Sequence, residues 1–279
     1  MAATKIIFVS QEISPYISAT PNARWGNTLP QAIQKRKYEV RTFMPDYGDI
    51  NERRNQLHEV IRLSGMNITI DDADHPLVVK VASMQPSRIQ VYFIDNDDYF
   101  QKLDSDSDPF GTNRADNDER IIFFARGTME TAKKLRWEPA VMEVSGWIST
   151  LVPIYLKTLF KDGPNFLTTK LVYTVLPDFA PLGTLNDSFL DKMVEEGVPA
   201  EAVEEFRGLP LDETLLHKMA IRHADAVVFQ TETPAEELVA FCEELGKPWR
   251  HFISAEGTLE DHADDYDALY KSLMTSDES

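Results

Sequence analysis

The sequence has a single cysteine, Cys242, among 279 residues. One cysteine cannot form a disulfide framework, and it cannot build a cysteine-ligated zinc or iron–sulfur site. The 6 histidines show no metal-ligand spacing either. The two nearest in sequence, His217 and His223, fall on different sides of one predicted helix. The sequence therefore predicts no metal site.

Glycines are few and widely spaced. The chain has 12 of them, and no two are separated by a single residue, so no Gly-x-Gly occurs. Dinucleotide-binding and phosphate-binding loops both need closely spaced glycines, because their backbone must approach a diphosphate. The Gly-x-Ser-x-Gly turn of serine hydrolases is absent as well. We therefore expect no nucleotide cofactor and no serine nucleophile.

Basic residues are outnumbered: 28 Lys and Arg against 46 Asp and Glu leave a formal charge of −18. Such a chain repels nucleic-acid phosphates and anionic membranes unless a basic patch is set apart, and the sequence shows none. No apolar run approaches the ~20 residues of a membrane-spanning helix. The short run Ile6–Val9 lacks the features of a signal peptide. The expectation is a cytoplasmic protein without nucleic-acid or membrane partners.

The sequence does contain short apolar runs that alternate with helical patterns. The predicted strand Lys5–Ser10, helix Arg24–Lys37 and strand Tyr38–Met44 form a βαβ unit. The same alternation continues, which predicts an α/β fold with a doubly wound, Rossmann-like parallel sheet. The later strands are expected at residues 140–144, 170–175 and 226–230, and the later helices at 116–135, 149–160, 188–196, 200–206, 215–223 and 233–245.

One stretch interrupts this alternation, and the end of the chain differs from the rest. Short, partly alternating runs between residues 57 and 94 (60–63, 66–70, 77–82 and 89–94) predict a small antiparallel insertion whose last strand rejoins the main sheet. Residues 95–117 are expected to form an acidic loop. We divide the chain into a domain of residues 1–255 and an acidic C-terminal helix and tail, residues 256–279.

Six stretches occur in the order and spacing of a known family. They are KIIFVSQEISPY, LPQAIQKRKYEVRTFMPDYG, VYFIDNDDYF, DNDERIIFFARGTMETAKKLRWEPAVMEVSGWISTLVPIYLKTLF, KLVYTV and HADAVVFQTETPAEEL. From about Lys5 to Leu245 the chain resembles the N-terminal catalytic domain of bacterial glycogen and starch synthases, the family-5 glycosyltransferases. The resemblance implies one half of a GT-B fold. In that family, two Rossmann-like domains face each other across a cleft and transfer glucose from ADP-glucose to an α-1,4-glucan. We see no match here to the family's C-terminal, nucleotide-binding domain.

The resemblance also implies which positions perform the family's chemistry, and three of them differ here. Ser18 stands where the family has a phosphate-contacting lysine, and the nearby Pro21 lacks a backbone donor. Ile148 replaces a histidine that lies close to the transferred glucose, and it cannot donate a hydrogen bond. Leu176 replaces the histidine of a Tyr-Thr-Ile-His-Asn stretch. The sequence therefore predicts no catalytic residue at these positions.

Four residues are candidates for binding a glucan in the remaining half of the cleft. Tyr16 and Trp25 offer aromatic rings, which hold neutral sugars without positive charge. Arg24 is a candidate cation, and Glu143 is the only new potential acid or base. Each has a structural alternative, which for Trp25 is packing of a helix on the sheet and for Arg24 is pairing with a nearby carboxylate.

We interpret the sequence as a catalytically degenerate domain, a pseudoenzyme, that needs no cofactor and binds an α-glucan or a partner protein of glucan metabolism. The first alternative is an active ADP-glucose:α-1,4-glucan glucosyltransferase in which this chain is half of a split enzyme and a second polypeptide supplies the nucleotide domain. A second alternative is another small-molecule enzyme that reuses the cleft. It depends on Glu143 and on three arginines, Arg24, Arg114 and Arg120.

Overall fold

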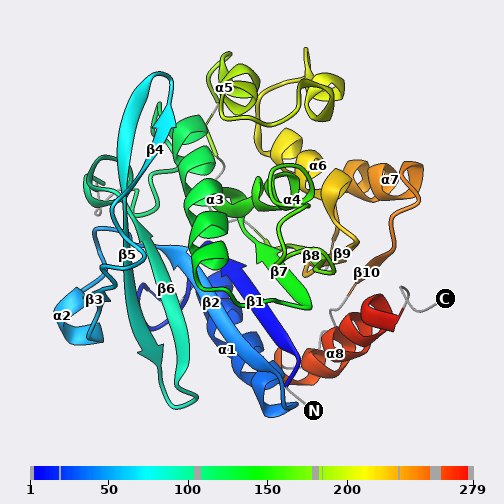
Figure 1. The fold of residues 1–279 in the computed structure, drawn as a ribbon. Coiled ribbons are helices and arrows are strands. Elements are labelled where there is room, and N and C mark those ends of the chain that lie inside the picture. The colour runs from blue at the N-terminus through cyan, green and yellow to red at the C-terminus, as the bar shows by residue number, and fades with distance from the viewer. Residues whose placement is uncertain are drawn as a thin grey trace.

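The computed structural model describes residues 3–18, 20–103, 108–177, 182–183, 185–231, 233–251 and 259–275. Ten strands form a sheet in the order β10-β9-β8-β7-β1-β2-β6-β5-β3, with β4 paired to β5 off this path (Figure 1). The strands are β1 (Lys5–Ser10), β2 (Glu39–Pro45), β3 (His58–Glu59), β4 (Met66–Ile70), β5 (Ala73–Met84), β6 (Ile89–Asp95), β7 (Val141–Ser145), β8 (Lys170–Val175), β9 (Ala226–Phe229) and β10 (Trp249–His251).

The helices alternate with these strands along most of the chain. They are α1 (Pro21–Lys35), α2 (Glu52–Asn55), α3 (Asn117–Lys134), α4 (Val152–Lys157), α5 (Phe189–Glu195), α6 (Glu213–His223), α7 (Glu236–Glu244) and α8 (Leu259–Thr275). Seven of the strands, β1, β2 and β6 to β10, pair in parallel. The predicted doubly wound α/β sheet is confirmed.

The connections place helices on both faces of the sheet. From β1 the chain moves through α1 to β2 on one side, whereas from β7 it moves through α4 to β8 on the other. Because such crossovers are right-handed, the two directions of travel put α1 and α4 on opposite faces. Figure 1 shows α3, α4 and α6 together on one face, and α1 with α8 on the other.

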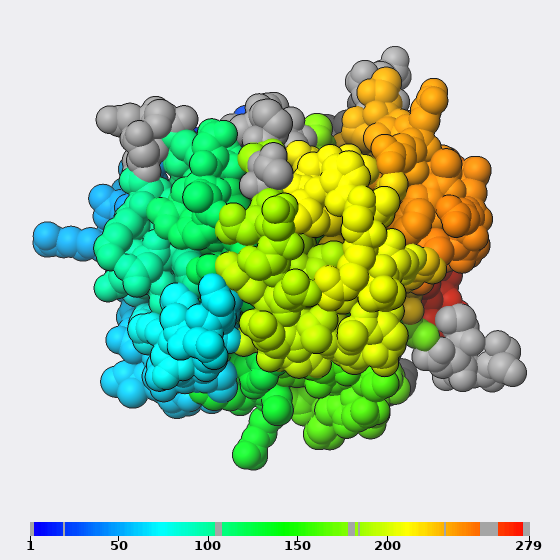
Figure 2. Space-filling view, turned by 90° about the horizontal axis from the view of Figure 1, so that it is seen from above, coloured from blue at the N-terminus to red at the C-terminus, as the bar shows by residue number. Residues whose placement is uncertain are grey.

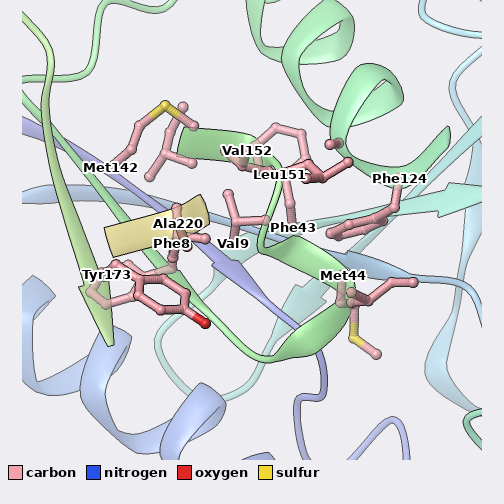
Figure 3. Packing of buried hydrophobic residues seen from close by; sticks show 14 of the residues in the cluster. Phe8, Val9, Phe43, Met44, Phe124, Met142, Leu151, Val152, Tyr173 and Ala220 are labelled. Atoms are coloured by element: carbon pink, nitrogen blue, oxygen red, sulfur yellow. The ribbon is translucent and has the colours of Figure 1, made fainter. Parts of the chain in front are cut away.

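The central strands are buried on both faces. Residues 6–10 of β1 and all of β7 are fully or almost fully inaccessible to solvent. Such strands favour near-continuous apolar runs, because neither face meets water. Figure 3 shows Phe8 and Val9 of β1 beside Phe43 and Met44 of β2, with helical residues such as Phe124 above them.

The insertion is antiparallel, as expected, and it extends the main sheet. β5 pairs antiparallel with β4 on one side and β6 on the other. Lys80 of β5 ties the insertion to the sheet, since its ammonium bonds to Asp46 at 2.8 Å and to Asp95 at 2.7 Å. Seen from above, the insertion lies beside the segment that carries α5 (Figure 2).

Some local predictions are wrong. Residues 60–63 form a turn, in which the Leu63 and Ser64 amides both donate to the Val60 carbonyl, instead of a strand. Residues 200–206 form two short 3₁₀ turns instead of a helix. The expected loop after β6 contains a π-helical turn, Asp97–Gln101. The strand β10 was not expected, because its three residues carry no apolar pattern.

The C-terminal helix α8 packs against α1 and covers the face of the sheet that α1 leaves open. Its Tyr266 and Tyr270 are fully buried, and the Tyr38 hydroxyl donates to Asp267 at 2.6 Å. The helix is therefore part of the folded body. The predicted boundary at residues 255 and 256 lies outside the described residues, so the division into two parts stays a prediction.

Candidate functional site

Ligands of doubly wound folds bind where the direction of strand order reverses, at the carboxyl ends of the strands. Here that point lies between β1 and β7. The turns after these two strands are bonded to each other, since Gln11 accepts a hydrogen bond from the Trp147 amide at 3.0 Å. Gly146 has φ +86°, and a side chain there would collide with Gln11. The two turns therefore pack directly against each other at the switch point.

One segment stands where the resemblance puts the family's phosphate loop. Its polar groups form hydrogen bonds within the protein. Thr20 caps α1 by accepting from the Ala23 amide at 2.9 Å, and its hydroxyl donates to Glu12 at 2.5 Å. Pro21, the first residue of the helix, has no N–H. Burial raises the pKa of Glu12, although the bonds from Thr20 and Gln11 act in the opposite sense. The start of α1 thus offers few free donors to a phosphate.

The other two substituted positions are filled by apolar side chains that are buried. Ile148 is fully inaccessible and Leu176 is 5% exposed. Ser18, in contrast, is exposed. The structure therefore places no proton donor or acceptor at Ile148 or Leu176, and neither side chain can assist in transferring a glucosyl group.

Two sequence-predicted binding residues do not lie in an open cleft. Glu143 occupies the middle of β7 and is fully buried beneath α8, where it accepts from Thr174 at 2.5 Å and from Tyr270 at 2.8 Å. Trp25 is 2% exposed, with its ring edge-on to Phe8 and to Tyr266 of α8. The expectation that they face a ligand is corrected, because α8 covers both.

The arginines proposed for the cleft also have other surroundings. Arg120 is fully buried and donates to the carbonyls of Tyr99, Gly111 and Phe110 at 2.8–2.9 Å. Arg114 pairs with Asp116. Arg24 is exposed on α1, next to the buried Trp25. Since the first two arginines fasten the loop before α3, the small-molecule enzyme that depended on Glu143 and these arginines loses its support.

Of the sequence-predicted binding residues, Tyr16 lines a cavity in the part of the chain that the structure describes. A groove of about 570 Å³ runs between the turn after β1 and the insertion. We call it the Tyr16 groove. It is lined by Tyr16, Asn55, Gln56, His58, Ser83 and Gln85, among others. The Tyr16 ring packs edge-on against Phe93, with centroids 4.9 Å apart, and burial raises its pKa to about 12. The ring is thus held firmly, and its hydroxyl stays protonated at neutral pH. Tyr16 is 6% exposed, so only a small part of it faces the groove.

The polar side of the groove comes from the end of α2 and from the insertion, and the sequence alone marks neither as part of a site. Side-chain amides and hydroxyls can bond to sugar hydroxyls without adding charge. Arg54 is the cationic member of the lining. Nothing in the sequence alone brings Gln56 or Gln85 next to Tyr16, because their places depend on the pairing of β5 with β3 and with β6.

In the part of the chain that the structure describes, no group of three or more metal-ligating side chains is able to hold an ion, and no helix is long and apolar enough to cross a membrane. The expected absence of a metal site and the expected cytoplasmic location remain predictions.

Comparison with known proteins agrees with the fold and with the resemblance seen in the sequence. The family model "Starch synthase catalytic domain" matches residues 5–248. The glycogen synthase of Pelodictyon phaeoclathratiforme is 31% identical over 236 residues, which are 84% of this chain and 47% of that protein. The glycogen synthase of Chlorobium luteolum is 34% identical over 195 residues, 70% of this chain and 40% of that protein.

A solved structure shows the same fold. The catalytic domain of starch synthase IV from Arabidopsis thaliana, bound to ADP and acarbose, superposes with a TM-score of 0.69 at 15% identity, and the match covers 90% of this chain and 51% of that one. The chain spans about half the length of the relatives it matches, which is consistent with one half of a GT-B fold. The resemblance is confirmed, and this chain belongs to the starch synthase catalytic domain family.

Proposed function

We propose that this chain is a catalytically degenerate member of its family that acts by binding an α-glucan, and that the Tyr16 groove is the binding site. The observation that supports binding is the composition of the groove: a firmly packed aromatic ring opposite side-chain amides and a hydroxyl. Neutral sugars are recognised by this combination of an apolar surface and convergent polar groups.

The loss of catalysis is inferred from the three substituted positions together. Ser18 supplies no positive charge, Ile148 is buried and apolar, and Leu176 cannot exchange a proton. Enzymes typically lower the barrier of their reaction by ~8–23 kcal/mol, and much of this comes from charged or hydrogen-bonding groups aimed at the reacting atoms. The lack of such groups at these three positions favours binding over transfer.

The purified chain is expected to transfer no glucose from ADP-glucose to glycogen. Thr20 and Pro21 close the position of the phosphate loop, and Ile148 replaces a hydrogen-bonding side chain. The measurement is incorporation of labelled glucose into glycogen, compared with a boiled-protein blank. Incorporation above the blank by the chain alone would contradict the pseudoenzyme proposal and favour an active transferase.

Maltooligosaccharides are expected to bind with a dissociation constant in the roughly micromolar to millimolar range, little changed between low and high salt. Contacts to neutral sugars do not release counterions, whereas phosphate contacts weaken steeply with salt. Replacing Tyr16 by Ala should weaken binding by about 1 kcal/mol or more, an estimate from aromatic contact energies. Isothermal calorimetry with maltoheptaose measures both effects.

A second variant of the groove and a control outside it sharpen this measurement. Gln85→Ala shortens an exposed polar side chain of the lining, so it should weaken glucan binding without affecting the core. Arg53→Ala changes an exposed residue of α2 outside the lining and should leave affinity unchanged. If the folded parent protein shows no heat of binding, the glucan proposal is wrong, and a partner protein of glucan metabolism becomes the better explanation.

A further inference from the structure

A second cavity lies beside the starts of β7 and β8 and shares no lining residue with the Tyr16 groove. It has a volume of about 690 Å³ and is bounded by the end of α3, the start of β4 and the loop that follows α4. We call it the amino-edge pocket, because β7 and β8 begin beside it. Its volume falls within the ~300–1,000 Å³ typical of small-molecule sites. None of the positions to which the resemblance assigns the family's chemistry lies in this pocket.

The inner wall of the amino-edge pocket is apolar. Leu159, Phe160 and Phe166 come from the loop after α4, and Met66 comes from β4. The two phenylalanine rings are edge-on, with centroids 6.1 Å apart, and each is at most 5% exposed. These rings form a preorganised apolar floor, whereas Met66 and Leu159 are partly exposed and in reach of a ligand.

The rim is cationic in a protein whose formal charge is −18. Lys133, Lys134 and Arg136 lie on it, together with the carboxylates of Glu130 and Glu138. Glu130 is already engaged, since it lies 3.2 Å from Arg126 and 3.9 Å from Lys133. Three cations against two carboxylates leave the lining with a local excess of one positive charge.

Arg136 is the cation best placed to receive a ligand. It follows the last turn of α3 with φ 50°, a left-handed conformation in which glycine or asparagine is usual. Its side chain is exposed, and in the described part of the chain no ion pair or hydrogen bond involves its guanidinium. Lys134, in contrast, donates to the Leu63 carbonyl at 3.2 Å.

From this arrangement we propose that the amino-edge pocket binds a small organic anion with an apolar or aromatic body. The body would lie against Leu159 and Met66, and the negative group would face Arg136 and Lys133. Since the whole chain repels anions at long range, recognition depends on these nearby cations, within a Debye length of about 8 Å at physiological salt. A neutral ligand of the same shape would lose that contribution.

The test compares two probes that share one aromatic body. Anilinonaphthalene sulfonate carries a negative charge, and N-phenyl-1-naphthylamine is its uncharged counterpart. The sulfonate is expected to bind saturably at one site, more tightly than the neutral probe, and to weaken as salt rises. Arg136→Glu should raise the dissociation constant of the sulfonate by about tenfold, because the local excess of charge changes sign. The same variant should leave the dissociation constant of the neutral probe unchanged. Fluorescence titration of the full chain measures all of these.

Two further variants separate this site from general surface binding. Lys37→Glu reverses an exposed cation that also follows a helix with a positive φ, at 70°, but lies outside the pocket. This variant should leave the affinities of both probes unchanged. Asn165→Trp places a large side chain in the lining and should reduce the binding of both. Equal affinity for the two probes, or a sulfonate affinity that Arg136→Glu leaves intact, would overturn the proposal. Glucan binding should be unchanged in all three variants.

Discussion

At pH 9, the Glu143→Gln variant is expected to be more stable than the parent protein, whereas at pH 5 the two should differ little. Burial raises the pKa of Glu143 from an ordinary value of 4.5 to about 8, despite hydrogen bonds from Thr174 and Tyr270. The folded protein therefore keeps a proton that the unfolded chain releases. The contribution of Glu143 to the free energy of unfolding is fully present below the pKa of the unfolded chain. It is lost as pH rises from about 4.5 to about 8, the pKa in the folded protein.

The size of this effect follows from the shift. Each pKa unit corresponds to about 1.4 kcal/mol, so charging Glu143 costs on the order of 5 kcal/mol in the folded state. Glutamine has nearly the same shape and stays neutral. Its amide oxygen can accept from one of the Thr174 and Tyr270 hydroxyls, and its amide N–H can donate to the oxygen of the other. Urea unfolding at a series of pH values measures the difference between variant and parent.

A matched control is Glu59→Gln, which alters an exposed carboxyl group and should leave the pH profile of the parent protein unchanged. If the free energy of unfolding depends on pH in the same way for Glu143→Gln and the parent, Glu143 does not titrate between about pH 4.5 and 8. Other buried acids, such as Asp46 with its raised pKa, act equally on both proteins and cancel in the comparison.

Trp25→Ala is expected to lower the free energy of unfolding by about 3–5 kcal/mol, the usual cost of removing a buried large aromatic side chain. The ring is 2% exposed and contacts both Phe8 of β1 and Tyr266 of α8, so its loss leaves a cavity between the sheet and the C-terminal helix. Maltooligosaccharide affinity should stay unchanged in the folded fraction, because the Tyr16 groove does not include Trp25.

The neighbouring residue supplies the control for this prediction. Arg24→Ala alters an exposed side chain on the same turn of α1, and surface changes of this kind usually alter stability by about 0.5 kcal/mol or less. Chemical unfolding and calorimetry on the same samples separate the two properties. A Trp25→Ala protein with normal stability but weakened glucan binding would restore Trp25 as a sugar contact.

The arrangement of Trp25 and Glu143 shows why the site was harder to predict than the fold. Glu143 and Tyr270 are 127 residues apart in the chain, yet their side chains are hydrogen-bonded. Sequence periodicity identifies α8 as an apolar-sided helix without indicating which surface it covers. Once α8 lies on the sheet, Trp25 and Glu143 belong to its interface with the sheet. Contacts between distant segments likewise decide that Gln56 and Gln85 line the Tyr16 groove.

The sequence by itself determined the doubly wound sheet, the antiparallel insertion and the family. Buried strands such as Lys5–Ser10 must be continuously apolar, and their alternation with helices requires parallel pairing through right-handed crossovers. Through the resemblance it also predicted that Ser18, Ile148 and Leu176 stand at functional positions of the family with different chemistry. Only the tertiary structure decided which polar and aromatic side chains reach solvent. Exposure depends on contacts between distant segments, and here the docking of α8 buries Trp25 and Glu143 while the insertion leaves Tyr16 beside an open groove.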